Sequence, residues 1–193
     1  MLTGEDVGFL RVDQREESDI AFLRRLAGAL GYALKLAHGK VIVMDEHSQE
    51  SGPEVGRIVR GEEGSSVQIT ESSADVYRAC RLSYQNAGVG KLCEVLFTPD
   101  PAPKVKQVLK VFQRVESAAA ARRRARTELR RQNQKEVTGS VECMGNLHYC
   151  AGAVVLLSGF ARLDGRYFIE SATHRVDAGG YASSLRIRRV LGY

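Results

Sequence analysis

The stretch of sequence that decides the fold is residues 137–190, which read VTGSVECMGNLHYCAGAVVLLSGFARLDGRYFIESATHRVDAGGYASSLRIRRV. Apolar and polar residues alternate through much of it, which is the period of a half-buried β-strand. Strands are predicted over Val137–Met144, Ala153–Ser158, Arg166–Val176 and Tyr181–Val190. Turns are predicted at Gly145-Asn146, Asp164-Gly165 and Gly179-Gly180. Short strands at regular spacing with glycine turns predict an antiparallel barrel or sandwich.

The chain before this stretch is also mostly β. Further strands are predicted over Val55–Val59, Ser66–Thr70, Val76–Tyr84, Lys91–Phe97 and Val105–Val115. The third and fourth of these form a predicted hairpin, because Asn86-Ala87-Gly88 lies between them. The proline-rich run 98–103 separates the last two, since proline cannot donate to a strand ladder.

A single arginine-rich helix interrupts the strands at residues 117–134. Ser117 can cap its first turn, and alanine, arginine, leucine and glutamine are strong helix formers. Its narrow apolar stripe consists of Ala118, Ala121, Ala125 and Leu129. Arg122, Arg126 and Arg130 stand one turn apart. The helix is therefore expected to pack closely through alanines and to present arginines to solvent or to a partner.

The N-terminal part predicts a different kind of unit. Ser18 or Asp19 can cap a helix whose apolar residues recur at helical spacing, and Gly31 follows where a left-handed C-cap belongs. A short hairpin comes next, over residues 32–45 with a turn at His38-Gly39, and residues 47–53 are predicted to form a loop. The expected class is α+β, mainly β: a small α/β domain over 1–52, then a β-barrel-like domain over 53–193 with the helix inserted.

Composition and the length of the apolar stretches argue against a largely disordered chain and against a membrane-spanning helix. The chain has 193 residues, 44% of them hydrophobic and 26% charged, which is close to the globular average. The longest apolar stretch, residues 151–161, falls well short of the roughly 20 residues that a membrane-spanning helix needs. We therefore expect no membrane partner.

The net charge of +5 is unevenly placed. Residues 104–135 hold eleven Lys and Arg residues against Glu116 and Glu128. Such a segment can meet nucleic acid, an acidic protein surface or another subunit, or it can be a solvated helix face. No DNA-binding motif accompanies it, and aromatic residues do not interleave with the arginines as they do in stacking platforms.

No residue pattern points strongly to catalysis. The sequence contains neither a G-x-S-x-G elbow nor a phosphate-binding G-x-x-x-x-G-K-[ST] loop. Cys143, His148 and Cys150 lie close enough to suggest metal ligation, but no partner pair stands at a familiar zinc spacing. We therefore expect a protein that is not an enzyme and that has no cofactor and no metal.

The order of residues resembles a known family. Its first marker is the run ESDIAFLRRLA at 17–27, followed by Gly31-Tyr32 and a hairpin. Later markers are helix 118–131, Thr138-Gly139-Ser140, Gly145-Asn146, Asp164-Gly165-Arg166-Tyr167 and the terminal Leu185-Arg186-Ile187-Arg188-Arg189. These resemble the phage late control protein D family, the baseplate hub proteins of contractile tails, which are related to the hub part of type VI secretion spike proteins.

The resemblance implies structural work in a virion. Hubs of that family form homotrimers whose barrel-like domains build a ring between the tail tube and the central spike. The implied location is the tail baseplate, assembled in the host cytoplasm, and the implied partners are tube and spike proteins. Family hubs carry a barrel before the ESD element, which here begins only 17 residues in. We therefore expect either a C-terminal fragment or a hub split between two chains.

In a trimer the arginines can face acidic surfaces of neighbouring subunits. The residues expected to contact a neighbouring subunit or another partner are Arg122, Arg126, Arg130, Arg186 and Arg188. Two other classes stay open: a nucleic-acid-binding module that uses the basic 104–135 segment, and a peptidoglycan-cleaving baseplate enzyme with spaced carboxylates on its barrel.

Overall fold

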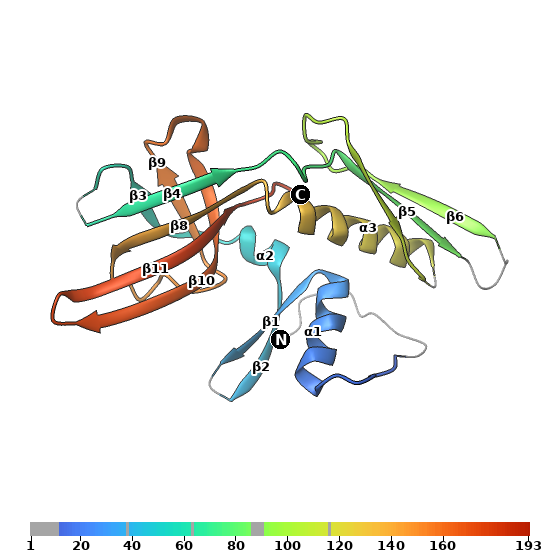
Figure 1. Ribbon diagram of the computed structural model, residues 1–193, viewed down its shortest axis with the longest axis horizontal. Coiled ribbons are helices and arrows are strands. Elements are labelled where there is room, and N and C mark those ends of the chain that lie inside the picture. Colours follow the sequence, from blue (N-terminus) through green and yellow to red (C-terminus); the bar gives the residue numbers. More distant parts are fainter. Residues whose placement is uncertain (1–11, 38, 63, 86–90, 116) are drawn as a thin grey trace.

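Two β-sheets with separate cores and one small helix–hairpin unit make up the chain (Figure 1). The computed structural model describes residues 12–37, 39–62, 64–85, 91–115 and 117–193. In Figure 1 the larger sheet lies to the left, the smaller sheet with its helix to the right, and the helix–hairpin unit below. Strands dominate, as the sequence predicts, and helices are few.

The larger sheet contains six strands in the order β3-β9-β10-β11-β8-β4. Their bounds are Glu54–Val59 (β3), Ser66–Glu71 (β4), Val137–Met144 (β8), Val154–Ser158 (β9), Gly165–Asp177 (β10) and Gly180–Arg189 (β11). The four strands predicted from residues 137–190 are all present and pair with one another antiparallel. Inward residues such as Val141, Tyr167 and Ile187 form one buried core.

This sheet does not close into a barrel among the described residues. Its edges are β3 and β4, and β3 pairs only with β9, in parallel. The predicted antiparallel barrel is therefore not confirmed, and the parallel pair corrects it. Parallel neighbours require a long crossover connection, which here spans the whole smaller sheet and its helix. Strand periodicity reports which face is buried but not which strands are neighbours.

The smaller sheet has the order β6-β5-β7, with β5 at Ala79–Gln85, β6 at Leu92–Phe97 and β7 at Val108–Phe112. The predicted β5–β6 pairing is confirmed, and its predicted turn at 86–88 lies outside the described residues. The strand predicted from Val105 begins only at Val108, and it pairs with β5 in parallel. These three strands form their own sheet and not part of the predicted single barrel.

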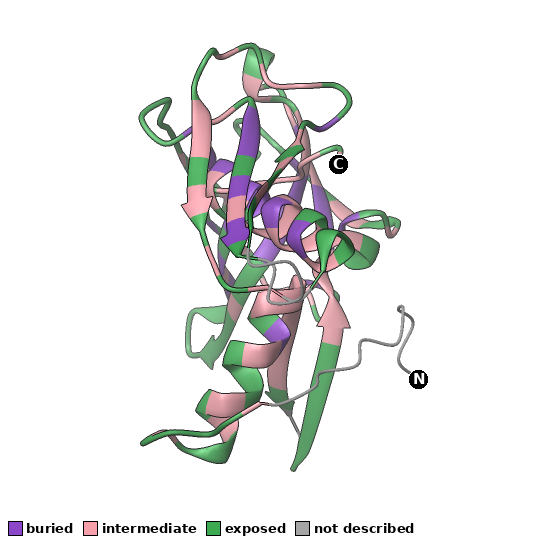
Figure 2. Ribbon diagram, turned by 90° about the vertical axis from the view of Figure 1, so that its right-hand side faces the viewer, coloured by how far each residue is buried: buried purple, intermediate pink, exposed green. Residues whose placement is uncertain are grey.

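The arginine-rich helix α3, Ala118–Asn133, covers one face of the smaller sheet. Ser117 caps it by accepting a hydrogen bond from the backbone N of Ala120. Three residues of the predicted stripe, Ala121, Ala125 and Leu129, are buried against Cys80, Leu82 and Tyr84 of β5. Alanine side chains let the helix approach the sheet closely, which is why a helix with so few large apolar residues can still bury its face. In Figure 2 buried residues concentrate in α3 and the strands beside it.

The N-terminal unit consists of α1 (Asp19–Leu30), β1 (Tyr32–Ala37) and β2 (Lys40–Asp45). Both predicted caps are present: Ser18 accepts from the backbone N of Ala21, and Gly31 adopts a left-handed conformation with φ 84°. The two strands pair antiparallel as predicted, although His38 of the turn lies outside the described residues. This unit is more exposed than the sheets (Figure 2).

A short helix, α2 (Glu46–Glu50), stands where a loop over 47–53 was predicted. Asp45 starts it, because its carboxylate accepts from the backbone N of His47 and from the hydroxyl of Ser48. The other short element is the 3₁₀ turn η1, Ala161–Leu163. None of the helices in the described part of the chain has the length and apolar composition of a membrane-spanning segment.

Candidate functional site

The three units of the fold meet at one buried carboxylate, that of Glu50 on α2. Its Oε1 accepts a hydrogen bond of 2.6 Å from Nη1 of Arg188 on β11, and its Oε2 accepts one of 2.8 Å from Nη2 of Arg130 on α3. The side chains of Glu50, Arg188 and Arg130 are 1%, 2% and 8% exposed. A single glutamate thus joins the helix–hairpin unit, the larger sheet and the smaller sheet.

Neighbouring groups complete this ion cluster. Arg188 also lies 3.2 Å from Glu46 and 3.3 Å from Glu170, and its guanidinium stacks over the ring of Phe168 at 4.4 Å. The side-chain amide of Gln134 donates to Glu46 over 3.1 Å. A buried charge pair contributes little net stability when it is complete, but removal of one member leaves the other charge uncompensated. The cluster therefore links α2, α3 and β11 through charges that depend on one another.

A second polar contact anchors the C-terminal end of α3. The Asn133 amide donates to the carbonyl of Tyr77 and to the hydroxyl of Tyr193, and its Oδ1 accepts from the backbone N of Tyr77. Burial raises the pKa of the Tyr193 hydroxyl, and the hydrogen bond with Asn133 opposes that rise. These bonds hold the C-terminal tyrosine beside the smaller sheet.

A groove of about 600 Å³ opens between α1 and α3, next to this cluster. Five arginines line it: Arg24 and Arg25 from α1, and Arg124, Arg130 and Arg131 from α3. The two helices come close at the end of α1, where a Cβ placed on Gly31 would lie 3.2 Å from Oγ1 of Thr127. The groove is therefore basic and lined mainly by two helices that are distant in sequence.

Part of this charge is neutralised within the chain. Arg25 pairs with Glu17, and Arg124 pairs with Glu128 one helical turn away. The pair with Glu17 lowers the pKa of that carboxyl and raises the pKa of the Arg25 guanidinium. The Arg25–Glu17 pair has an exposed member and belongs to the class of surface ion pairs that stabilise folding weakly, whereas both members of the Arg124–Glu128 pair are half-buried.

His47, on α2, has a pKa below its ordinary value in the folded chain. Burial lowers the pKa of His47, and the charges of Arg130 and Arg126 lower it further, while Asp45 and Glu50 act in the opposite direction. Its Nδ1 is buried without a hydrogen-bond partner among the described residues. A neutral imidazole is therefore favoured at this position.

The structure separates the five arginines that the sequence singles out. Arg122 and Arg186 are exposed, and Arg126 is half-buried. Arg130 and Arg188 are buried and share Glu50, so their charges are already paired inside the chain. A single chain does not test the expectation that the five arginines contact a partner. Arg130 and Arg188, however, are buried and are not exposed at the surface of this chain.

Sequence reasoning missed the acidic residues of the site. Glu50 lies in the segment 47–53 that is predicted to be a loop, and Glu46 lies directly before it; both resemble solvated surface residues in the sequence. Asp45 followed by a run of polar helix formers was the one local signal of α2. No local signal predicts that Glu50 is buried, since its partners are 80 and 138 positions away.

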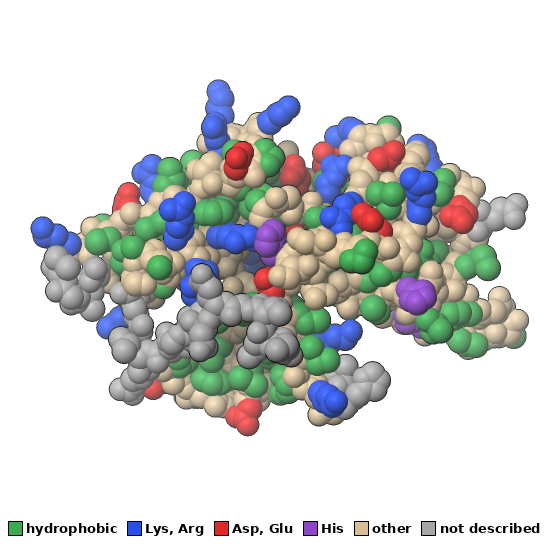
Figure 3. All heavy atoms as spheres, turned by 180° about the vertical axis from the view of Figure 1, so that it is seen from behind, with side chains coloured by type: hydrophobic (Ala, Val, Ile, Leu, Met, Phe, Trp, Pro, Cys, Tyr) green, Lys and Arg blue, Asp and Glu red, His purple; other side chains and the backbone are tan. Residues whose placement is uncertain are grey.

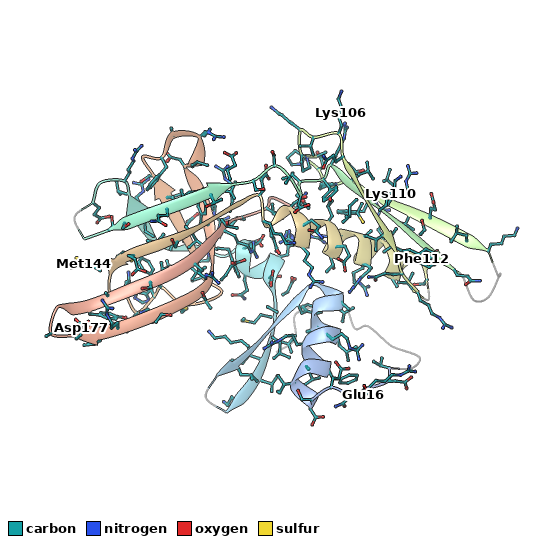
Figure 4. All side chains as sticks on the ribbon, in the orientation of Figure 1. Glu16, Lys106, Lys110, Phe112, Met144 and Asp177 are labelled. Carbon is teal, nitrogen blue, oxygen red and sulfur yellow. The ribbon has the colours of Figure 1, made fainter. Side chains whose placement is uncertain are left out.

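Two exposed apolar areas lie at opposite ends of the molecule. The face of the smaller sheet that α3 does not cover exposes Leu92, Leu96 and Phe112. Near the tip of the larger sheet, Met144, Leu147 and Val176 are exposed. Figure 4 shows Phe112 and Lys110 at β7 and Met144 and Asp177 at the other end of the long axis. Exposed apolar patches of this kind often mark protein interfaces.

Cysteine and histidine side chains are the candidate metal ligands in the sequence. All four cysteines are free, and burial raises the pKa of the Cys80 thiol to about 11. Within the described ranges, no group of three or more His, Cys, Asp or Glu side chains could hold a metal ion. His174 contacts the hydroxyls of Ser183 and Tyr181, at 3.0 Å each, close to the turn of the long β10–β11 hairpin.

The fold is shared with phage tail proteins. A tail protein from Neisseria meningitidis superimposes with a TM-score of 0.71 at 15% identity, over 93% of this chain and 57% of that chain. The 43 kDa tail protein of prophage MuSo2 from Shewanella oneidensis gives 0.73 at 18% identity, over 96% and 60%. Prophage tail protein gp18 from Listeria monocytogenes gives 0.59 at 14% identity, over 91% and 55%. The chain spans less than two thirds of each of these structures.

The sequence comparison defines the family. The sequence profile of the YQBQ-like family matches residues 55–188, from β3 to the end of the larger sheet. The chain belongs to the YQBQ-like family. No curated protein matches the sequence significantly.

Proposed function

We propose that the chain is a structural protein of a phage tail, and that within the tail it is part of the baseplate hub of a contractile tail or a related injection system. The observation that carries this proposal is the superposition of more than nine tenths of the chain on tail proteins. A chain in the virion of a gene transfer agent also matches, with a TM-score of 0.52 at 20% identity. In this role the chain joins the tail tube to the central spike as one subunit of a homotrimeric ring.

The exposed features of the chain suit an assembly protein. The smaller sheet has one face covered by α3 and one face open, with Leu92, Leu96 and Phe112 exposed on it. In the larger sheet β3 and β4 are edge strands, and edge strands offer backbone groups to a neighbouring chain. Closed symmetric rings bury such surfaces between identical subunits.

Three exposed or half-buried arginines are the candidates for contacts in the ring. Arg122 and Arg126 lie on α3, which covers the smaller sheet, and Arg186 lies on β11 of the larger sheet. In the proposed trimer they face acidic surfaces of neighbouring subunits or of the tube and spike proteins. A separate chain that supplies the N-terminal barrel of family hubs would complete the ring.

The test has two parts. Light scattering at several salt concentrations counts the copies of the chain. Three copies are expected, either alone at about three times 21.2 kDa or within a heavier complex with the neighbouring tail proteins. A tagged chain is also expected in purified tail particles, at the baseplate end in labelled electron micrographs. Absence of the chain from intact tails would overturn the tail role, and a stable monomer in the assembled complex would overturn the ring.

Charge reversal tests the arginines separately. The variant R122E/R126E/R186E is expected to assemble weakly while its circular dichroism spectrum stays that of the wild type. The matched control reverses three other exposed basic residues, Arg60, Lys91 and Lys104, which carry the same total charge change. Equal assembly of the two variants would show that the three arginines make no specific contact.

A nucleic-acid-binding role receives less support from the geometry. Within the basic 104–135 segment, Arg124 and Arg130 are paired with carboxylates of the same chain. On the face shown in Figure 3, Lys and Arg side chains are dispersed among acidic and apolar ones. Continuous basic surfaces with stacking rings are typical of proteins that bind single-stranded nucleic acid.

We also propose that the chain is not an enzyme.

A further inference from the structure

The groove between α1 and α3 contains donors that the described part of the chain leaves unused. Nη1 of Arg130 and Nε of Arg124 are buried and have no hydrogen-bond partner there. Both residues line the groove, and the side chain of Arg130 is more than nine tenths buried. Buried guanidinium donors are normally satisfied, and an unsatisfied one is costly because water cannot replace the missing acceptor.

The rim of the groove carries further positive charge. Arg24 and Arg131 are exposed on opposite helices and form no ion pair with any described residue. The one acidic side chain among the described lining residues is Glu46, and it already accepts from Gln134 and Arg188. The groove therefore holds more positive charge than its own carboxylates neutralise.

The arrangement of these donors selects the chemistry of a ligand. A guanidinium presents paired N–H groups that match the two oxygens of a carboxylate, and such charge-assisted bonds are stronger than neutral ones. The lining of the groove includes the small residues Ala21, Gly28 and Ala29, which allow an extended backbone to approach closely. Among the described lining residues Tyr32 is the sole aromatic ring, so the groove offers no platform on which successive bases could stack.

We propose that this groove binds an acidic peptide segment of a protein partner, with its carboxylates held by the exposed Arg24 and Arg131, while the buried guanidiniums of Arg124 and Arg130 add positive potential to the groove. The inference deepens the proposed function, on which it rests in one respect: the partner would be another tail chain. The site itself belongs to the isolated chain. Glu50 positions Arg130 and remains bonded to it when the groove is filled.

The experiment uses the full chain and a fluorescein-labelled octaglutamate peptide, with binding followed by fluorescence anisotropy at low and at physiological salt. An octaglutamine peptide controls for contacts with the backbone. The test variant is R24Q/R131Q, because both residues are exposed and their loss leaves the buried cluster intact. Its affinity for octaglutamate is expected to fall by at least about tenfold, as expected when two charge-assisted hydrogen bonds are lost.

The matched control variant is R60Q/R81Q, which removes the same charge from exposed positions outside the groove. It is expected to change the affinity less than the test variant does. Equal losses in the two variants would overturn the proposal, because the peptide would then respond to net charge alone.

Two competitors identify the class of ligand. Inorganic phosphate that binds as tightly as octaglutamate would show a small-anion site and overturn the peptide proposal. If an oligonucleotide of equal charge binds more tightly than the peptide, and the R24Q/R131Q variant loses this binding, the ligand of the groove is nucleic acid and the peptide proposal is wrong. Binding of octaglutamate by a chain that is absent from tail particles would leave the groove site standing while the proposed function failed.

Discussion

Arg188 and Glu50 are 138 positions apart in the sequence, yet Nη1 of the arginine lies 2.6 Å from Oε1 of the glutamate, and both side chains are almost fully buried. One residue belongs to the central part of the larger sheet and the other to a five-residue helix. Because Arg130 of α3 shares the same carboxylate, one glutamate of α2 links the larger sheet to the helix that covers the smaller sheet.

The substitution Glu50→Gln is expected to destabilise the fold strongly. It removes the one charge that Arg130 and Arg188 share, and an uncompensated buried charge costs about 3–5 kcal/mol. Urea denaturation followed by circular dichroism measures this loss. The control is Glu54→Gln, which breaks a partly exposed pair with Arg166 and is expected to cost about 1 kcal/mol or less. Similar losses in the two variants would contradict the buried cluster.

His47 is expected to make stability depend on pH. Its pKa in the folded chain is lower than that in the unfolded chain, about 6.5, so the unfolded state binds the proton first. Stability is therefore retained above about pH 6.5 and falls as the pH drops from there through the folded pKa. Denaturation midpoints between neutral and mildly acidic pH measure the effect.

The variant His47→Gln is expected to flatten this part of the pH profile. The control is His148→Gln, at an exposed position, which should leave the profile unchanged. A profile for His47→Gln that matches the wild type would assign the pH dependence to other groups.

Cys80 is expected to resist thiol reagents in the folded chain. Its side chain is buried between β5 and α3, and its pKa of about 11 leaves little reactive thiolate at pH 8. A colorimetric disulfide reagent should therefore label the exposed Cys150 quickly and Cys80 only when the chain unfolds. Mass spectrometry of the labelled peptides identifies the sites, and rapid labelling of Cys80 in Cys150→Ser would contradict the packing of α3.

Gly139 of β8 is expected to be required for the close pairing of β8 with β4. A Cβ at this position would lie 2.5 Å from the backbone oxygen of Gln68, so one strand would have to move. Gly139→Ala should cost about 1–3 kcal/mol of stability in a thermal or urea denaturation, as overpacking commonly does. The control is Gly28→Ala in the last turn of α1, where a Cβ would meet no atom within 4 Å apart from its chain neighbours and the backbone of its own helix. That change should raise stability by about 0.5–1 kcal/mol, because alanine favours the helix.

Local patterns in the sequence were sufficient to predict most of the elements. The strands of residues 137–190 follow from alternation with a period of two, and the ends of α1 follow from Ser18 and Gly31. The buried stripe of α3 follows from alanine and leucine at helical spacing. These features depend on residues within a few positions of one another, and that is why they can be read from the sequence alone.

Only the tertiary structure decided which elements are neighbours and which charges are buried. The parallel pairs β3–β9 and β5–β7 join strands that other elements separate in the chain, so periodicity carries no information about them. Arg130 and Arg122 have the same chemistry and stand on one helix, yet Arg130 is buried against Glu50 and Arg122 is exposed. Burial of a charge requires a counter-charge from a distant segment, and that pairing exists only when the chain has folded.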